Sequence, residues 1–242
     1  MNTTRLFIPN LFVVAVLSLA SVGCGGSGGG SGSSETAMLR VISGSWAVGS
    51  LSVIVNGATV ATNIAYPMCV NEVCETLSSY LTVPAGGVAF AVESTGSTTN
   101  LVPQLANLNL APNTHNTLIV VGTVDAIPAG GYLLRDDDTP ATNSVKLRIA
   151  STDPTVGTLA AWVLPDGTTP SGTPTISNVM LGSASSYLTL PPGAYDETFA
   201  ITCFVGPNCI GVGPTTLSAN KNVTVYVLSE GLSHRPLILA DN

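Results

Sequence analysis

The stretch "SSYLTVPAGG", residues 78–87, occurs a second time as "SSYLTLPPGA", residues 185–194. Seven of the ten positions are identical, and the two copies begin 107 residues apart in a chain of 242. Two further pairs of segments match: "LRVISGS" at 39–45 with "LRIASTD" at 147–153, and "NLNLAPNTHNTLIVVG" at 107–122 with "PTTLSANKNVTVYVLS" at 214–229. The repetition predicts one domain of about 100 residues used twice, which is a common domain size.

Apolar residues alternate with other residues along short segments of both copies, for example at 51–55 and 223–227. Turn-forming residues recur about every ten positions, which predicts about seven short strands per copy. Charged residues make up only 9% of the chain, and the remainder is typical of β-branched strands joined by Gly, Pro and Asn turns. The sequence therefore predicts an all-β chain with two tandem antiparallel β-sandwich domains, immunoglobulin-like or transthyretin-like in outline.

The repeat and the changes in composition predict the domain boundaries. A signal peptide and a Gly/Ser tether precede the first sandwich, and a short polar linker joins it to the second. The predicted ranges are 1–23 for the signal peptide, 24–37 for the tether, 38–138 for repeat 1, 139–144 for the linker and 145–242 for repeat 2.

Each copy of the opening motif predicts a tight hairpin turn. Tyr80 and Tyr187 begin a strand, and the following "PAGG" or "PPGA" combines a Pro with preset φ and a Gly that tolerates positive φ. Asn56-Gly57 and Asp166-Gly167 predict a further hairpin in each copy. We interpret the two Tyr residues as packing residues of their own domains, with the hydroxyl at the rim; the alternative is a pair of ligand contacts.

The first 24 residues are typical of an export signal. The apolar run at 11–20 is too short for a comfortable membrane span of ~20 residues. "ASVGC" at 20–24 resembles the lipobox of bacterial lipoproteins, which implies a lipidated Cys24 at the mature N-terminus, followed by a flexible Gly/Ser tether. By the same resemblance, Gly25 implies sorting to the outer membrane if the source is a Gram-negative bacterium. The alternative is an ordinary secretory signal with an unmodified Cys24.

The other four cysteines form two local pairs, Cys69 with Cys74 and Cys203 with Cys209. Export implies an oxidising compartment, which favours disulfides. Three pairings are formally open, and proximity in sequence favours the local ones, each worth roughly 2 kcal/mol. A zinc site is the alternative, but "CFVGPNC" lacks the spacing of a zinc knuckle. We therefore expect two disulfides and no metal.

The charge distribution excludes one class of partner and leaves one weak metal candidate. The formal net charge is −7, with seven Lys plus Arg in the chain, so no basic patch for nucleic acid can form. Asp136, Asp137 and Asp138 form the densest acidic cluster and are weak candidates for Ca²⁺ ligands between the domains. Our preferred interpretation of this cluster is a solvated linker. No cofactor is predicted.

The sequence contains no recognisable catalytic constellation. No G-x-S-x-G nucleophile elbow occurs in the predicted folded part. His115 falls in a predicted turn and His234 lies near the C-terminus, and we expect both to be solvated loop residues and not catalytic bases. Trp46, in a Gly/Ser loop, is a candidate ligand contact for carbohydrate or peptide stacking, and the more common alternative is a Trp that caps the core. Trp162 lies in a strand pattern and is predicted to be in the core.

The combined motifs resemble the bacterial family called domain of unknown function 4397. They are the strand "LRV" or "LRI", the Asn-Gly or Asp-Gly turn, the "SxYLxLPAG" stretch and a following "L…Y-x-V" segment. The likeness covers about residues 38–242, and the first copy departs from it by an insertion at 68–77. Members are commonly secreted or lipid-anchored and often carry the domain in tandem. The resemblance implies a fold and a location, but no reaction.

We therefore expect a non-catalytic, lipid-anchored cell-envelope protein, a binding or scaffolding module for an envelope or extracellular protein or a glycan. Two alternatives stay open. A subunit of a surface fibre or adhesin would need an unpaired edge strand that accepts a neighbour. A secreted hydrolase of unrecognised type would need a cleft that gathers His115 or paired carboxylates.

Overall fold

The computed structural model describes most of the chain after the tether. The described residues are 35–45, 48–67, 69–70, 73–74, 79–122, 130–137, 139, 141–153, 156–168, 171–202, 207–230 and 233–241. Side chains are described for these residues except 69–70, 73–74, 196–202, 207–214, 229–230 and 233–235. Ser34–Asn242 forms one compact unit. A helix with the length and apolarity needed to cross a membrane does not occur among the described residues.

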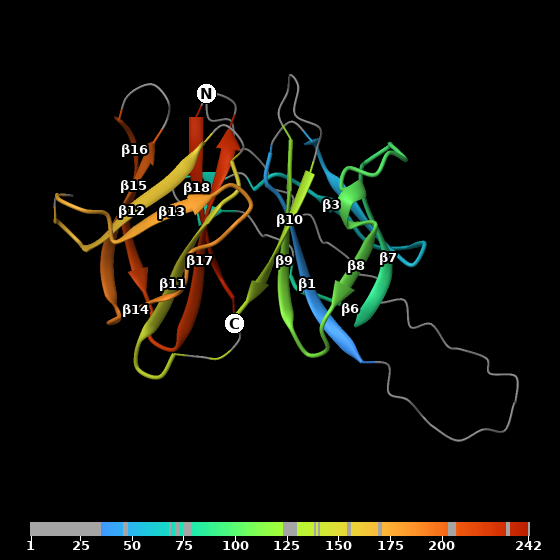
Figure 1. Ribbon diagram of the computed structural model, residues 1–242, viewed down its shortest axis with the longest axis horizontal. Coiled ribbons are helices and arrows are strands. Elements are labelled where there is room, and N and C mark those ends of the chain that lie inside the picture. The colour runs from blue at the N-terminus through green and yellow to red at the C-terminus, as the bar shows by residue number, and fades with distance from the viewer. Residues whose placement is uncertain are drawn as a thin grey trace, which may run out of the picture. The chain divides into compact units, whose positions relative to one another are not determined.

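Repeat 1 is a sandwich of two four-stranded sheets (Figure 1). The strand order is β10-β9-β1-β6 in one sheet and β3-β2-β7-β8 in the other, and β4 and β5 form a separate small hairpin. The strands are β1 (Thr36–Ser43), β2 (Leu51–Val55), β3 (Ala58–Ile64), β4 (Cys69–Val70), β5 (Val73–Cys74), β6 (Leu81–Pro84), β7 (Gly86–Ser94), β8 (Asn107–Leu110), β9 (His115–Val121) and β10 (Gly130–Asp136).

Repeat 2 has the same strand order. Its sheets are β18-β17-β11-β14 and β13-β12-β15-β16, so each strand corresponds to one of repeat 1. The strands are β11 (Val145–Ser151), β12 (Thr158–Pro165), β13 (Ile176–Met180), β14 (Leu188–Leu190), β15 (Gly193–Thr202), β16 (Pro207–Leu217), β17 (Lys221–Glu230) and β18 (Ser233–Ala240). The chain is therefore all-β and contains two β-sandwich domains.

One pair of neighbouring strands in each repeat is parallel. β1 runs parallel to β9, with Arg40 opposite Thr117, and β11 runs parallel to β17, with Arg148 opposite Thr224. Parallel strands are usually buried on both faces, and their sequences are then apolar nearly throughout. β9 fits this rule, because every residue after His115 is buried.

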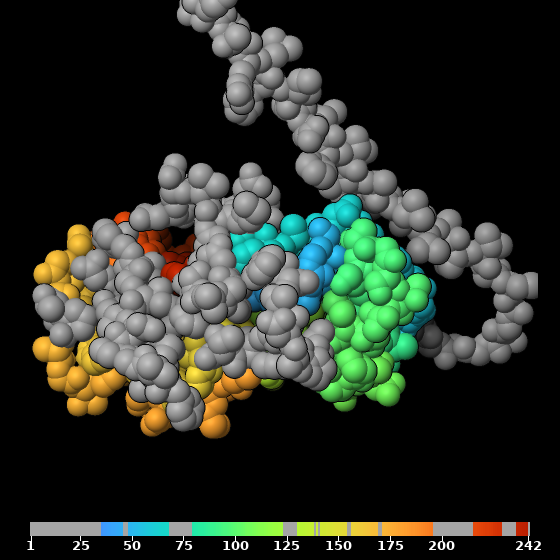
Figure 2. Space-filling model, turned by 90° about the horizontal axis from the view of Figure 1, so that it is seen from above, coloured from blue at the N-terminus to red at the C-terminus, as the bar shows by residue number. Residues whose placement is uncertain are grey.

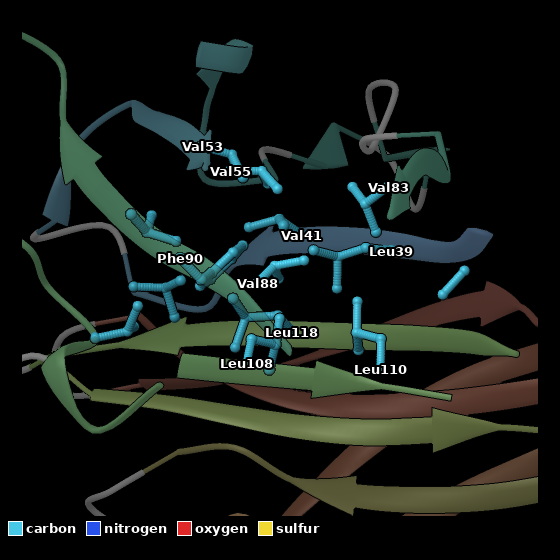
Figure 3. Close-up of a cluster of buried hydrophobic side chains, with 14 of the residues drawn as sticks. Leu39, Val41, Val53, Val55, Val83, Val88, Phe90, Leu108, Leu110 and Leu118 are labelled. Carbon is cyan, nitrogen blue, oxygen red and sulfur yellow. The ribbon is translucent and has the colours of Figure 1, made fainter. Parts of the chain in front are cut away.

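Alternate residues of the facing sheets fill the core of repeat 1. Leu39 and Val41 of β1 project toward Val88 and Phe90 of β7 (Figure 3), and all four are at most 3% exposed. The sequences of both strands place an apolar residue at every second position, so the predicted period of two is the one that forms the core. Burying each of these side chains contributes roughly 1.5–3 kcal/mol.

The outer face of the sheet β3-β2-β7-β8 carries small and polar side chains. Ala89, Ala91 and Glu93 of β7 lie on this face and are exposed or half-buried. Figure 2 shows part of the surface of this repeat, with residues of β2 and β3 in cyan and those around β8 in green.

The repeated motif is a corner between the two sheets and not a hairpin. β6 pairs with β1, whereas β7, which begins after a single residue, pairs with β2 and β8 in the other sheet. Gly86 has φ 83°, a conformation that favours Gly. β14 and β15 are divided between the sheets of repeat 2 in the same way. The prediction of a hairpin was wrong because Pro and Gly indicate a change of direction but do not determine which strand the chain pairs with after the turn.

The two dipeptides predicted to form hairpins behave differently. Asn56 and Gly57 have φ 51° and 78° and directly join β2 to β3, as a type I′ turn requires. Only Gly167 of the second dipeptide has positive φ, and ten residues separate the end of β12 at Pro165 from the start of β13 at Ile176. The second dipeptide therefore begins a longer loop.

A third apolar cluster joins the two repeats. Ile42 and Ile119 of repeat 1 pack in it with Ala150 and Tyr226 of repeat 2. These residues alternate with the core residues of their strands, so β1, β9, β11 and β17 are buried on both faces. The molecule thus has a core inside each sandwich and another between them.

Candidate functional site

A charged residue occupies the same place in the middle of an apolar strand in both repeats. Arg40 of β1 lies between Leu39 and Val41, which face the core of repeat 1. Because side chains alternate along a strand, Arg40 projects from the opposite face, toward repeat 2. Arg148 of β11 has the equivalent place in repeat 2, and the two Arg residues are only 4% and 5% exposed.

Arg40 binds both its own repeat and the other one. Its Nε donates to Thr117 Oγ1 at 3.0 Å. Its Nη1 donates to the carbonyl oxygen of Ala240 at 2.7 Å, and its Nη2 donates to Asp241 Oδ1 at 2.9 Å and to the Tyr226 hydroxyl at 3.4 Å. The guanidinium therefore donates hydrogen bonds to one group of repeat 1 and to three groups of repeat 2.

Arg148 repeats this arrangement in the reverse direction. Its Nε donates to Thr224 Oγ1 at 2.7 Å, within repeat 2. Its Nη1 donates to the carbonyl oxygen of Arg135 at 2.8 Å, and its Nη2 donates to Asp136 Oδ1 at 2.5 Å. Each Arg thus contacts the Asp of the other repeat and the carbonyl just before that Asp.

The two carboxylates are held in place by hydroxyl groups of their own repeats. Asp136 Oδ2 accepts from Thr117 and from Tyr80, both at 2.7 Å. Asp241 Oδ2 accepts from Thr224 at 2.5 Å and from Tyr187 at 2.9 Å. Both Asp side chains are 0% exposed, so these hydrogen bonds replace the water that the carboxylates lose on burial.

Tyr80 and Tyr187 occupy equivalent places, as the duplication predicted. The guanidinium carbon of Arg40 lies 4.7 Å from the ring centroid of Tyr80, and that of Arg148 lies 4.7 Å from the ring centroid of Tyr187. Each ring therefore makes a cation–π contact within its own repeat. The expected position of the hydroxyl at the rim was wrong, because each hydroxyl donates to a buried Asp.

Burial and the neighbouring groups shift the pKa values of three charged residues of the network. Burial acts to lower the pKa of Arg40 and Arg148, but the neighbouring Tyr and Asp groups outweigh it and raise both above the ordinary value. Burial raises the pKa of Asp241, to which the negative charge of Asp136 adds, while Thr224, Arg148 and Tyr187 oppose the shift.

The tyrosines of the network keep their hydroxyl protons. Burial raises the pKa of Tyr226 to about 12, and it raises the pKa of Tyr80 and Tyr187 beyond the usual range of a phenol. All three hydroxyls therefore remain hydrogen-bond donors at neutral pH. The network contains two positive and two negative groups, and its charges are balanced.

Such a network is suited to holding the repeats together and unsuited to acid–base chemistry. A general acid or base must come within hydrogen-bond reach of a substrate, and neither Asp side chain is exposed. His115 is the first residue of β9 and half-buried, with its ring centroid 4.9 Å from that of Tyr80 in an edge-to-face contact. The expectation that His115 is a solvated loop residue was therefore wrong. His234 has no described side chain.

The acidic cluster is divided among different partners. Asp136 belongs to the buried network, and Asp137 accepts from Lys146 Nζ at 2.7 Å. Asn222 Nδ2 donates to the carbonyl oxygens of Asp137 and Thr139, at 2.6 and 2.8 Å. This part of the linker is thus hydrogen-bonded to repeat 2, so the prediction of a solvated linker was wrong. Asp138 lies outside the described residues, among which no group of three or more His, Cys, Asp or Glu is placed to hold a metal ion.

The other predicted site residues are partly described. Trp46, Cys24 and Cys203 lie outside the described residues, and the side chains of Cys69, Cys74 and Cys209 are not described, so lipidation and both disulfides stay predictions. Trp162 is only partly buried and alternates with the core residues Ala161 and Val163, so it faces outward. The prediction of a core Trp was wrong because a strand pattern alone does not decide which face of β12 carries the Trp.

The edge strands β3 and β13 are both irregular. The register of β3 against β2 shifts near Asn63, that of β13 against β12 shifts near Asn178, and both Asn residues have φ 58°. A bulge bends an edge strand and interrupts its row of hydrogen-bonding groups, which hinders the addition of another strand. These two edges therefore do not support the fibre alternative.

Sequence reasoning missed the network, although one signal was present. The repeated "LR" places a positive charge at the same position of an apolar strand in both copies. Arg is rarely buried without a partner, so an Arg in the middle of an apolar strand indicates a buried partner. No corresponding signal identifies Asp241, because "LADN" near the C-terminus has no visible match to "LRDD" at 134–137 until the strands are aligned in space.

Comparison with solved structures finds similar chains, two of which are described as proposed cell adhesion proteins. One is the crystal structure of a proposed cell adhesion protein from Bacteroides uniformis ATCC 8492, with 12% identity, a TM-score of 0.29, and coverage of 85% of this chain and 96% of that one. Another is from Bacteroides fragilis NCTC 9343, also described as a proposed cell adhesion protein, with 10% identity, a TM-score of 0.24, and coverage of 86% and 98%. Superpositions with scores this low carry no argument about function.

The sequence comparisons identify the family. A search of curated proteins finds no match. The model of the family "Domain of unknown function (DUF4397)" matches residues 37–162, more than half of the chain. The matched range runs from β1 into β12 and includes Arg40, Tyr80, Thr117, Asp136 and Arg148. The chain belongs to the DUF4397 family.

Proposed function

We propose that this protein is a non-catalytic, lipid-anchored component of the cell envelope. Its two sandwiches act as one binding or scaffolding unit on a flexible tether, and its partner is an envelope or extracellular protein or a glycan. In a Gram-negative bacterium its membrane is the outer membrane, since Gly25 follows the lipidated Cys24. Support for the anchor comes from the lipobox-like "ASVGC" at 20–24 and from the Gly/Ser stretch after it.

The observation that carries the non-catalytic part of the proposal is the saturation of the buried network. Arg40, Arg148, Asp136 and Asp241 bind one another and neighbouring hydroxyl or carbonyl groups. Groups used in this way hold two domains in a fixed relation, which suits a protein that presents a surface away from the membrane.

Two local disulfides belong to the same proposal. Cys69 and Cys74 lie directly opposite each other in the antiparallel pair β4–β5, and residues so placed are close enough for a disulfide. An exported protein meets the oxidising conditions that such bonds require. Cys203 and Cys209 are proposed as the second pair from their spacing in sequence.

Membrane fractionation of cells that produce the Cys24→Ser variant tests the proposal. The wild-type protein should sediment with membranes and incorporate a labelled fatty acid, while Cys24→Ser should do neither. Ser31→Ala, which changes the tether and leaves Cys24 in place, is the matched control and should behave as wild type. Retention of Cys24→Ser in membranes after high-salt washing would contradict the lipid anchor.

A further inference from the structure

The contacts between the repeats have the reciprocity of a two-fold symmetric dimer. Arg40 contacts Asp241 and the carbonyl before it, and Arg148 contacts Asp136 and the carbonyl before it. In a symmetric dimer, if residue i of one copy contacts residue j of the other, then j also contacts i. The two repeats follow this rule with equivalent residues, although they belong to one chain.

The equivalence includes the groups that support each ion pair. In both repeats the Arg Nε is bound by a Thr of the parallel neighbour strand, and the guanidinium lies over a Tyr ring at the same distance of 4.7 Å. In both, the Asp accepts from that Thr and that Tyr. Each repeat therefore presents one Arg and one Asp in the same prepared geometry. We call this surface of each repeat its inner face: Arg40, Tyr80, Thr117 and Asp136 in repeat 1, and Arg148, Tyr187, Thr224 and Asp241 in repeat 2.

It follows that each inner face is complementary to a copy of itself. If repeat 1 met another repeat 1 in the observed arrangement, Arg40 of each copy would lie against Asp136 of the other, with charges balanced as they are now. We propose that the inner face is a self-docking surface and that its partner outside the chain is the same repeat of a second copy of this protein.

The apolar part of the surface explains why the two repeats of one chain prefer each other. Ile119 and Tyr226 stand at equivalent positions, as do Tyr132 and Leu237, because they occupy matching places in the sheet registers. These residues pack in one cluster between the repeats. The differences in size favour the pairing of unlike repeats, and the short linker adds an effective concentration in the millimolar range. Pairing between two chains therefore requires that the inner face of one repeat first separates from the other repeat of its own chain.

Neutralising one inner face provides the test. In residues 34–242, the compact unit of the structure, Arg40→Met with Asp136→Leu removes both charges of repeat 1. Arg148 and Asp241 then lose their ion pairs with the other repeat and keep only each other, at 3.9 Å. Ion pairs as close as those between the repeats, 2.5 and 2.9 Å, can then form only with the repeat 2 of another chain. We expect the mass measured by light scattering to double relative to wild type at the same concentration. A folded variant that stays monomeric would overturn the proposal.

The matched control neutralises both inner faces. Adding Arg148→Met and Asp241→Leu leaves no buried charge in need of a partner, and replacing a buried ion pair by apolar residues is often tolerated. This four-residue variant should be monomeric again. A dimer here would mean that the association is merely hydrophobic, and it would overturn the proposed role of the charges.

A second measurement covers the case in which the two-residue variant does not fold. A protease site placed between Thr142 and Asn143, which are both exposed in a turn, allows the folded wild-type unit to be cut between the repeats. After dilution and reconcentration, native mass spectrometry should detect pairs of repeat 1 and pairs of repeat 2 beside the original unlike pair. Detection of only unlike pairs and free halves would overturn the proposal.

Discussion

The pair formed by Arg40 and Asp241 allows a quantitative prediction across 201 residues of chain. Their side chains are 5% and 0% exposed and are 2.9 Å apart. Removing one member of a buried ion pair leaves the other charge without compensation, which costs about 3–5 kcal/mol. Arg148 lies 3.9 Å from Asp241 and offsets part of this loss, so we expect about 3 kcal/mol for Arg40→Met and a similar value for Asp241→Leu.

The double variant should be less destabilised than the sum of the two single variants. With both residues replaced, the remaining pair of Arg148 and Asp136 is balanced, and no buried charge is left alone. We therefore expect a coupling free energy of at least about 2 kcal/mol, within the range observed for residues in contact. Both repeats should unfold in one transition, because the pair joins them.

Urea unfolding of residues 34–242 at pH 7, followed by tryptophan fluorescence, measures these free energies. The control is a second cycle that combines Arg40→Met with Asp137→Ala, because Asp137 binds Lys146 and not Arg40. That cycle should be additive within about 0.5 kcal/mol. A coupling below the same limit for Arg40 with Asp241 would refute the reasoning, since it would mean that the two repeats do not meet through this pair.

Two further predictions concern other contacts of repeat 2. Gly182 has φ 76°, and a Cβ there would overlap the ring of Tyr132 from repeat 1, so Gly182→Ala should lower the free energy of unfolding by about 2–5 kcal/mol, from backbone strain and overpacking together. Gly172, with φ 70° and no atom within 4 Å of the added Cβ, is the matched control, and an equal loss in both variants would exclude the contact with Tyr132. Lys146 holds the pKa of Asp137 below its usual value through a hydrogen bond. The resulting stabilisation is present above the unfolded pKa of about 4 and is lost as the pH falls through the folded pKa. The melting temperature of Asp137→Asn should therefore fall less on acidification than that of wild type, and equal slopes would contradict this.

Local patterns in the sequence were sufficient for the architecture. The period of two along residues 51–55 and 223–227 reports which side chains face a core, because a strand alternates its faces wherever it lies. The internal repeat then implies that the second domain repeats the first. The turn at Asn56-Gly57 was also predictable, since its geometry depends on two adjacent residues with positive φ.

The details that sequence reasoning missed all depend on contacts between distant strands. The "PAGG" at 84–87 specifies a change of direction, but only the pairing of β6 with β1 and of β7 with β2 makes it a corner between sheets. Trp162 was assigned to the core because a Trp in a strand is usually buried, while the register of β12 turns it outward.

The sequence by itself thus determined the strand period, the duplication and the class of fold, because these follow from neighbouring residues and from comparison of the chain with itself. Only the tertiary structure decided what contacts the face of β1 and β11 that lies opposite the core of each sandwich. Arg40 and Asp241 are brought together by the packing of one sandwich on the other, and no local preference of either residue encodes that contact. Burial then gives the contact its strength, because two charges removed from water must compensate each other.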